Sequence, residues 1–179
     1  QELTGYKVTE WKREAFVVRG FTMIDDPTSQ KGAIPAFWNS VAVDGRLNQL
    51  KEASSIPTSV LGVGSWDEEC PKNGSRYTIG IEKTEHASFR RIGNNLDIYT
   101  FEIGASDWLS FEMTFQRFRE RFWKDNPYKM LEALGYKFNM GSYDIGLHFE
   151  VYPPDFEPVD KASIEFWITV KNRSSAHLQ

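Results

Sequence analysis

The sequence predicts an α+β domain made of two βαββ repeats, and three observations lead to this prediction. Segments in which apolar and polar residues alternate, the pattern of a strand with one buried face, recur along the chain. Two stretches with helical spacing of apolar residues lie between them, one in each half. The strand after each helical stretch carries a glycine at its second position, Gly62 or Gly146. We expect repeats over about residues 5–85 and 88–171.

The first half should open with strands. Residues 6–22 are rich in β-branched and aromatic side chains and predict one or two strands, which a turn at 25–27 ends. A helix should begin at Ile34, where a proline follows in the first turn, and bend or break at 43–45, a Val-Asp-Gly sequence. Two short strands should complete this half. Their segments are 61–66 and 77–83.

The second half should repeat this order. Alternation predicts a strand within 89–103. A helix is expected over 107–124, because large apolar residues recur there at gaps of three and four, and their side chains should be core. These residues are Trp108, Phe111, Phe115, Phe118 and Phe122.

A second helical stretch, 128–134, should follow Pro127 and end at Gly135 as a cap. Strands over 145–152 and 164–170 should close the fold. We expect one domain over residues 1–172 and a frayed tail over 173–179.

The predicted architecture places a ligand cleft at the centre of the molecule. Each half would form an antiparallel sheet with its helix on one face, and the two would pack with pseudo-twofold symmetry. The opposite sheet faces would then form the cleft. If Gly62 and Gly146 align, Trp66 occupies in the first half the place of Glu150 in the second, so an aromatic wall would confront a carboxylate.

Residues 145–152 contain the strongest candidate for a functional site. The odd positions are apolar and should face the core, whereas the even positions hold Gly146, His148, Glu150 and Tyr152. A solvated strand face usually carries lysine and threonine, so we interpret this face as the lining of a cleft with Glu150 as its charged group. A solvated or arginine-paired Glu150 is the alternative. His148 either hydrogen-bonds near Glu150 or faces solvent.

Tryptophans supply the other candidates. Trp66 and Trp167 lie opposite the apolar run of their strands, where an exposed indole would favour association, so we expect them to line the cleft. Trp38, on the first helix, belongs either to the core or to the cleft. Glu82 and Glu165 share the outward faces of closing strands. A solvated role suits both, and Glu165, beside Trp167, is retained as a ligand-binding candidate.

Composition excludes several classes of function. The net charge is −4 and no basic run is present, which argues against a nucleic-acid surface. No apolar run approaches the length of a membrane span. A single cysteine, Cys70, excludes an internal disulfide and fits a reducing compartment, so we expect a soluble cytoplasmic protein. The three histidines and Cys70 lack metal-ligand spacing, and we expect neither metal nor cofactor.

Four segments together resemble the GyrI-like effector-binding family, which includes the ligand-binding domains of AraC-type and MerR-type bacterial transcription regulators and free-standing relatives. The resemblance covers nearly the whole chain. It implies a cleft that binds amphipathic, often cationic, molecules through a buried glutamate, which would be Glu150. It also implies that Trp167 reaches the same wall, and relatives usually have proline where Thr169 stands. The segments are 34–38 (IPAFW), 77–82 (YTIGIE), 149–152 (FEVY) and 164–171 (IEFWITVK).

The function expected on these grounds is the binding of amphipathic, multidrug-like cations by an effector-sensing module, without catalysis. A DNA-binding domain, in the same chain or in contact with it, would then be the partner that responds. One alternative is a hydrolase of reactive electrophiles, with Glu150 as general base and His148 or Tyr152 as proton partner. Another is a protein-interaction module, for which the acidic turn 67–69 is the candidate surface.

Overall fold

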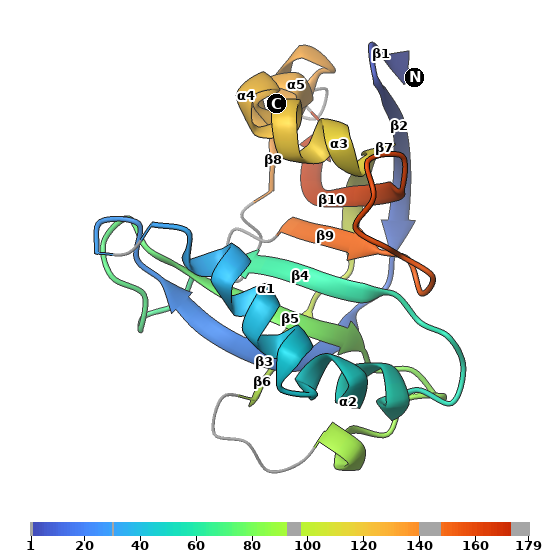
Figure 1. Ribbon diagram of the computed structural model, residues 1–179. Coiled ribbons are helices and arrows are strands. Elements are labelled where there is room, and N and C mark those ends of the chain that lie inside the picture. Colours follow the sequence, from blue (N-terminus) through green and yellow to red (C-terminus); the bar gives the residue numbers. More distant parts are fainter. Residues whose placement is uncertain (1, 30, 93–97, 140–147, 173–179) are drawn as a thin grey trace.

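The computed structural model, shown in Figure 1, describes residues 2–29, 31–92, 98–139 and 148–172. Within these residues, ten strands form one antiparallel sheet. Nine follow one another in the order β1-β2-β7-β10-β9-β4-β5-β3-β6, and β8 pairs with β10. The predicted α+β class is confirmed. In the described residues strands precede and follow the helices of both halves, with two strands after the helices in the first half and three in the second. The pseudo-twofold relation between the halves stays a prediction.

The first half contains strands on both sides of a broken helix. The predicted break is confirmed, because Gly45 separates the two helices in the left-handed conformation, with φ of 89°. The elements are β1 (Glu2–Leu3), β2 (Tyr6–Arg13), β3 (Phe16–Asp25), α1 (Ala33–Val43), α2 (Arg46–Ala53), β4 (Val60–Ser65) and β5 (Ser75–Glu82).

The second half starts with a short 3₁₀ turn and ends with the closing strand. The predicted second helix is confirmed, and Gly135 follows it with φ of 89°. The elements are η1 (Phe89–Ile92), β6 (Ile98–Ile103), β7 (Ser106–Thr114), α3 (Phe115–Arg117), η2 (Phe118–Phe122), α4 (Trp123–Asp125), α5 (Pro127–Ala133), β8 (Tyr136–Phe138), β9 (His148–Tyr152) and β10 (Ser163–Asn172).

The helix predicted over 107–124 is wrong in its first half. Residues 106–114 form strand β7, and the helix begins only at Phe115, where the Thr114 hydroxyl accepts a hydrogen bond from the backbone of Arg117. β7 is buried on both faces, so it lacks the alternation of a half-exposed strand. The expected burial of Trp108 is nevertheless correct.

Two smaller differences concern other strands. The strand expected within 89–103 is confined to β6, because residues 89–92 form the 3₁₀ turn η1. The short strand β8 was not predicted. For the strand expected over 145–152, residues 145–147, including Gly146, lie outside the described residues, and the remainder forms β9.

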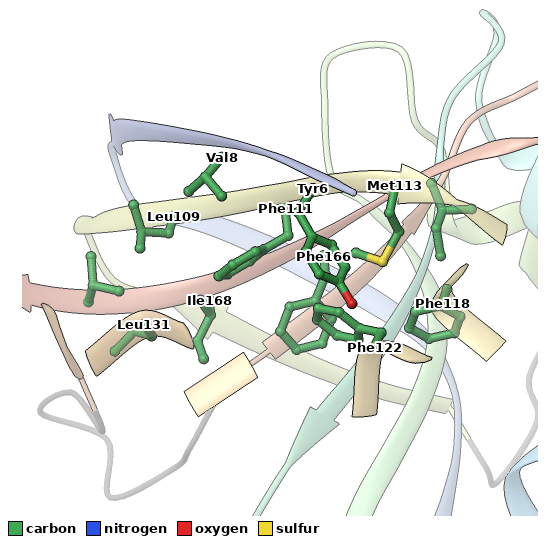
Figure 2. Close-up of a cluster of buried hydrophobic side chains, with 12 residues drawn as sticks. Tyr6, Val8, Leu109, Phe111, Met113, Phe118, Phe122, Leu131, Phe166 and Ile168 are labelled. Carbon is green, nitrogen blue, oxygen red and sulfur yellow. The ribbon is translucent and has the colours of Figure 1, made fainter. Parts of the chain in front are cut away.

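One face of the sheet carries both groups of helices. Cross-strand partners point to the same face of the sheet. Gly62 pairs with Ile79 on one side and with Glu150 on the other, and Glu150 in turn pairs with Phe166. Ile79 belongs to the core under α1 and α2, whereas Phe166 belongs to the core under η2 and α5. Figure 2 shows this second core, in which Phe111 and Phe166 from the sheet meet Phe118, Phe122 and Leu131 from the helices.

The opposite face of the sheet is closed by its own side chains. Phe16 and Val18 of β3 pack in one buried cluster with Trp108 of β7 and Phe149 of β9. The predicted cleft on the helix-free face is therefore incorrect, since aromatic core fills much of that face. An open cavity lies on the other face, between the two groups of helices.

Candidate functional site

A cavity of about 1210 Å³ lies between α1 and the helical segment 115–125, with β4, β5 and β9 as its floor. It is large enough for a drug-sized molecule. Aromatic side chains supply much of the lining, and Glu150 is the only carboxylate among the described lining residues. The π turn η2 and the residue after it bring aromatic side chains to the wall opposite α1. The aromatic lining includes Trp38, Tyr77, Phe118, Trp123, Tyr128 and Tyr152.

Glu150 occupies the middle of β9 and is only 7% exposed. Its neighbours on the same face are Gly62 of β4 and Phe166 of β10, which give it no opposite charge. Removal from water raises the pKa of Glu150 to about 7, although a hydrogen bond from Tyr77 acts in the opposite direction. At neutral pH the cavity therefore contains a carboxyl group that gains or loses its proton readily.

Tyr77 and Trp38 connect Glu150 to helix α1. The Tyr77 hydroxyl donates to Glu150 Oε2 over 2.6 Å, and the indole Nε1 of Trp38 donates to the Tyr77 hydroxyl over 2.8 Å. Tyr77 is 3% exposed, and burial raises its pKa well above the ordinary value. Tyr77 thus remains a neutral donor, and one oxygen of Glu150 is fixed against the wall.

Two glycines of β4 make room for these side chains. A Cβ at Gly62 would lie 2.3 Å from the Tyr77 hydroxyl and 2.8 Å from Glu150 Oε2. A Cβ at Gly64 would lie 2.4 Å from Nε2 of His148. Any side chain at these positions would displace a polar group of the cavity, so the need for glycine here is steric.

His148 forms part of the aromatic wall. Its ring stacks on Phe166 with centroids 5.2 Å apart, and Trp123 contacts it edge-on at 5.8 Å. Nδ1 lies 3.3 Å from the Tyr128 hydroxyl. Burial lowers the pKa of His148 to about 4, so the imidazole is neutral at physiological pH. His148 consequently adds surface and polarity to the cavity, without adding charge.

The pKa shifts of Glu150 and His148 predict opposite effects of pH on stability. Glu150 has its pKa raised from 4.5 to about 7, so between these values the native state binds more protons and the free energy of unfolding falls as pH rises. His148 has its pKa lowered from 6.5 to about 4, so between those values the unfolded state binds more protons and the free energy of unfolding rises with pH. The two contributions oppose each other between pH 4.5 and 6.5.

Single substitutions should separate these contributions. Relative to wild type, Glu150→Gln should gain stability as pH rises from 4.5 to 6.5, and His148→Gln should lose it over the same interval. Urea unfolding at pH 4.5, 5.5 and 6.5 measures both slopes. Curves for the two variants that run parallel to the wild-type curve would contradict the assignment of these shifts.

Five of the seven predicted site residues line the cavity. Glu150, Tyr152 and His148 reach it from β9, Trp38 from α1, and Trp66 from the end of β4. The Trp38 and Tyr152 rings contact each other at 5.0 Å, edge to face. Trp66 is 43% exposed, a value that places it at the mouth.

The structure does not bring Trp167 and Glu165 to this cavity. Phe166 is the β10 residue opposite Glu150, so its two neighbours point to the other face of the sheet. There Trp167 packs against Trp11 and donates from Nε1 to Glu165 Oε2 over 2.9 Å. The prediction assumed that a strand has one core face, whereas β10 contacts aromatic core on both.

Sequence reasoning missed several lining residues. Tyr77 alternates with Ile79 and Ile81 and was therefore assigned to the apolar face of its strand. Trp123 lies near the end of the helix predicted over 107–124 and Tyr128 begins the helical stretch predicted over 128–134, and neither carries a pattern that distinguishes it from core. A buried tyrosine needs a partner for its hydroxyl, which is the one signal that pointed to a polar group near Tyr77.

Among the described residues, neither a cluster of metal-ligating side chains nor a membrane-spanning helix is found. Within them, no group of three or more His, Cys, Asp or Glu side chains is arranged to hold a metal ion. None of the helices in this part of the chain combines the length and apolar character needed to cross a bilayer.

Comparison with solved structures places this architecture among known folds. Neither a protein-family model nor a curated protein matches the sequence. The structure of SAV2435 bound to tetraphenylphosphonium superimposes with a TM-score of 0.71 and 14% identity, over 96% of this chain and 98% of the other. The chain has the fold of GyrI-like effector-binding domains.

Two other structures share this GyrI-like fold. A putative bacterial transcription regulation protein from Staphylococcus aureus gives a TM-score of 0.62 and 15% identity, over 93% of this chain and 98% of the other. The C-terminal domain of EcmrR gives a TM-score of 0.54 and 12% identity, over 93% of this chain and 98% of the other. In a complex of EcmrR with DNA, the match covers 59% of the longer EcmrR chain.

Proposed function

We propose that this GyrI-like domain is an effector-binding module that captures amphipathic organic cations in the cavity around Glu150. The observation that carries the proposal is a carboxyl group, 7% exposed, inside an aromatic cavity of about 1210 Å³. The solved complex of SAV2435 with tetraphenylphosphonium, a lipophilic cation, supports it by similarity of fold.

The chemistry of the cavity suits such a ligand. A carboxylate loses hydration in an aromatic cavity, and an organic cation replaces that lost stabilisation. The faces of Trp38, Tyr128 and Tyr152 attract positive charge, each by roughly 0.5–2 kcal/mol. Because this attraction needs few directional hydrogen bonds, ligands of different shape can bind, which would give broad specificity.

Binding in this cavity would act on transcription through a DNA-binding domain. Similar folds occur in a putative transcription regulation protein and in EcmrR, which is solved in complex with DNA. We propose that this domain works with such a partner, in the same chain or in contact with it, and in the cytoplasm. The free energy available for switching is the difference in ligand affinity between the two conformations of the regulator.

Titration of the purified chain with tetraphenylphosphonium tests the proposal. Trp38, Trp66 and Trp123 line the cavity, so we expect saturable quenching of tryptophan fluorescence with one ligand per chain. Isothermal titration calorimetry on the same samples gives the stoichiometry independently. Absence of saturable binding up to millimolar ligand would contradict the proposed function.

The hydrolase alternative receives less support from the geometry. Among the described contacts, His148 bonds to Tyr128 and neither His148 nor Tyr152 bonds to Glu150. Burial raises the pKa of Tyr152 far above its ordinary value and lowers that of His148, so neither is a ready proton donor at pH 7. Turnover of an epoxide probe that disappears in Glu150→Gln would favour hydrolysis over simple binding.

A further inference from the structure

Glu150 presents its two oxygens to different surroundings. An indole N–H can only donate, so the bond from Trp38 occupies an acceptor site of the Tyr77 hydroxyl. The Tyr77 hydroxyl donates its own hydrogen to Glu150 Oε2. In the described part of the chain Oε1 has no hydrogen-bond partner, and it is not among the fully enclosed unpaired atoms. With Glu150 ionised, the direction of both hydrogen bonds is fixed, because an indole N–H can only donate and a carboxylate can only accept.

We propose, resting on the function proposed above, that Gly62, Tyr77 and Trp38 make Glu150 a one-sided ligand group whose Oε1 alone meets the ligand. As a carboxylate, Oε1 pairs with a cation. As a carboxylic acid, Glu150 carries its proton on Oε1, because Oε2 already accepts from Tyr77, and it donates this proton to a neutral ligand. The ligand class then includes neutral aromatic molecules with a strong hydrogen-bond acceptor, beside aromatic cations.

Gly62 is the steric element of this arrangement. A methyl group at this position would lie within 2.8 Å of both Glu150 Oε2 and the Tyr77 hydroxyl. Real Cβ atoms do not approach other atoms so closely, so the Tyr77 hydroxyl, Glu150 Oε2 or both would have to shift. Gly62 is also the direct cross-strand partner of Glu150. It therefore acts as a positioning residue although it has no side chain.

The histidine and the tyrosines that line the cavity keep one charge state between pH 5.5 and 8.5. His148 is neutral above its pKa of about 4. Burial raises the pKa of each lining tyrosine, so the phenols stay protonated. Glu150, with a pKa of about 7, is thus the cavity group that changes charge. The groups lining the cavity are His148, Tyr77, Tyr128, Tyr152, Lys51 and Arg119.

Two probes of similar shape and different charge test the proposal. Tetraphenylphosphonium is a cation, and triphenylphosphine oxide is a neutral molecule with a strong acceptor oxygen. From pH 5.5 to 8.5 we expect the affinity of the chain for the cation to rise roughly fivefold or more and its affinity for the oxide to fall. Calorimetric titration at four pH values gives both profiles.

Variants test the role of the positioning residues. Tyr77→Phe removes a hydrogen bond that favours the carboxylate, so the midpoint of the cation profile should move up by about one pH unit. Trp38→Phe should move the midpoint in the same direction by less, because the Tyr77 donor remains but is weaker. Gly62→Ala should also move the midpoint upward. Tyr136→Phe is the matched control: it deletes a phenol that donates to Glu10, away from the cavity, and should leave the midpoint unchanged.

The outcomes separate this inference from the function on which it rests. Cation binding that is absent at every pH overturns both. Cation binding that depends on Glu150, with an unchanged midpoint in Tyr77→Phe, overturns the positioning role alone. If the binding of triphenylphosphine oxide does not weaken as pH rises, the proposal that protonated Glu150 donates from Oε1 to a neutral ligand is wrong. Circular dichroism verifies folding, and if Gly62→Ala does not fold, Tyr77→Phe carries the test.

Discussion

Glu150→Gln is expected to weaken the binding of tetraphenylphosphonium at least about tenfold at pH 8.5, which corresponds to about 1.4 kcal/mol. At this pH the wild-type carboxyl, with a pKa of about 7, is ionised and pairs with the ligand. Glutamine retains the shape and still accepts from Tyr77, so the cavity should stay intact while its charge is lost. Fluorescence titration of both proteins measures the ratio.

Glu165→Gln is the matched control for this experiment. Glu165 belongs to β10 but points to the opposite face of the sheet, where it accepts a hydrogen bond from Trp167. The same change of chemistry there should leave the affinity within about twofold of wild type. Equal affinity of wild type and Glu150→Gln would mean that the cavity binds through its apolar surface alone.

Trp108→Ala is expected to lower the free energy of unfolding by about 3–5 kcal/mol. Trp108 is fully buried in the cluster on the helix-free face, where its ring packs against Trp11, Phe16 and Phe149. Alanine would leave a cavity among rings that come from three strands, β2, β3 and β9, and those strands cannot all shift to fill it. Unfolding in guanidinium chloride measures the loss.

Two further variants serve as controls for the loss of stability in Trp108→Ala. Trp66→Ala removes the same side chain from a position that is 43% exposed, and it should cost less than about 1 kcal/mol. Trp108→Phe should cost less than Trp108→Ala, since it keeps a ring and removes an indole N–H that has no partner among the described residues. A Trp108→Ala loss no larger than that of Trp66→Ala would contradict the assignment of Trp108 to the core.

Much of the fold was predictable because several of its elements have one buried face or strong end signals. The break at Gly45 and the cap at Gly135 follow from backbone conformations that favour glycine. Strand β7 was not predictable in this way. Its faces lie in two different cores, with Trp108 in one and Phe111 in the other, and only the tertiary structure supplies both.

The candidate site likewise contains residues that could be predicted from the sequence and residues that could not. Glu150 stood out because a carboxylate between apolar strand residues needs an explanation, and the structure places it inside the cavity. Trp167 looked equivalent, yet it lies on the other face of the sheet, because both faces of β10 meet aromatic core. Tyr77 has the alternation of a core residue, and its contact with Glu150 depends on the pairing of β4 with β5 and β9.

The most direct test of cation pairing at Glu150 is the proton balance of binding. Calorimetric titration with tetraphenylphosphonium at pH 6, in two buffers with different ionisation enthalpies, measures the number of protons released. Wild type holds most of its Glu150 as the acid at this pH, so binding should release close to one proton, and Glu150→Gln should release none. Identical binding heats for wild type in the two buffers would show that the ligand binds without the Glu150 carboxylate, which contradicts the proposed recognition.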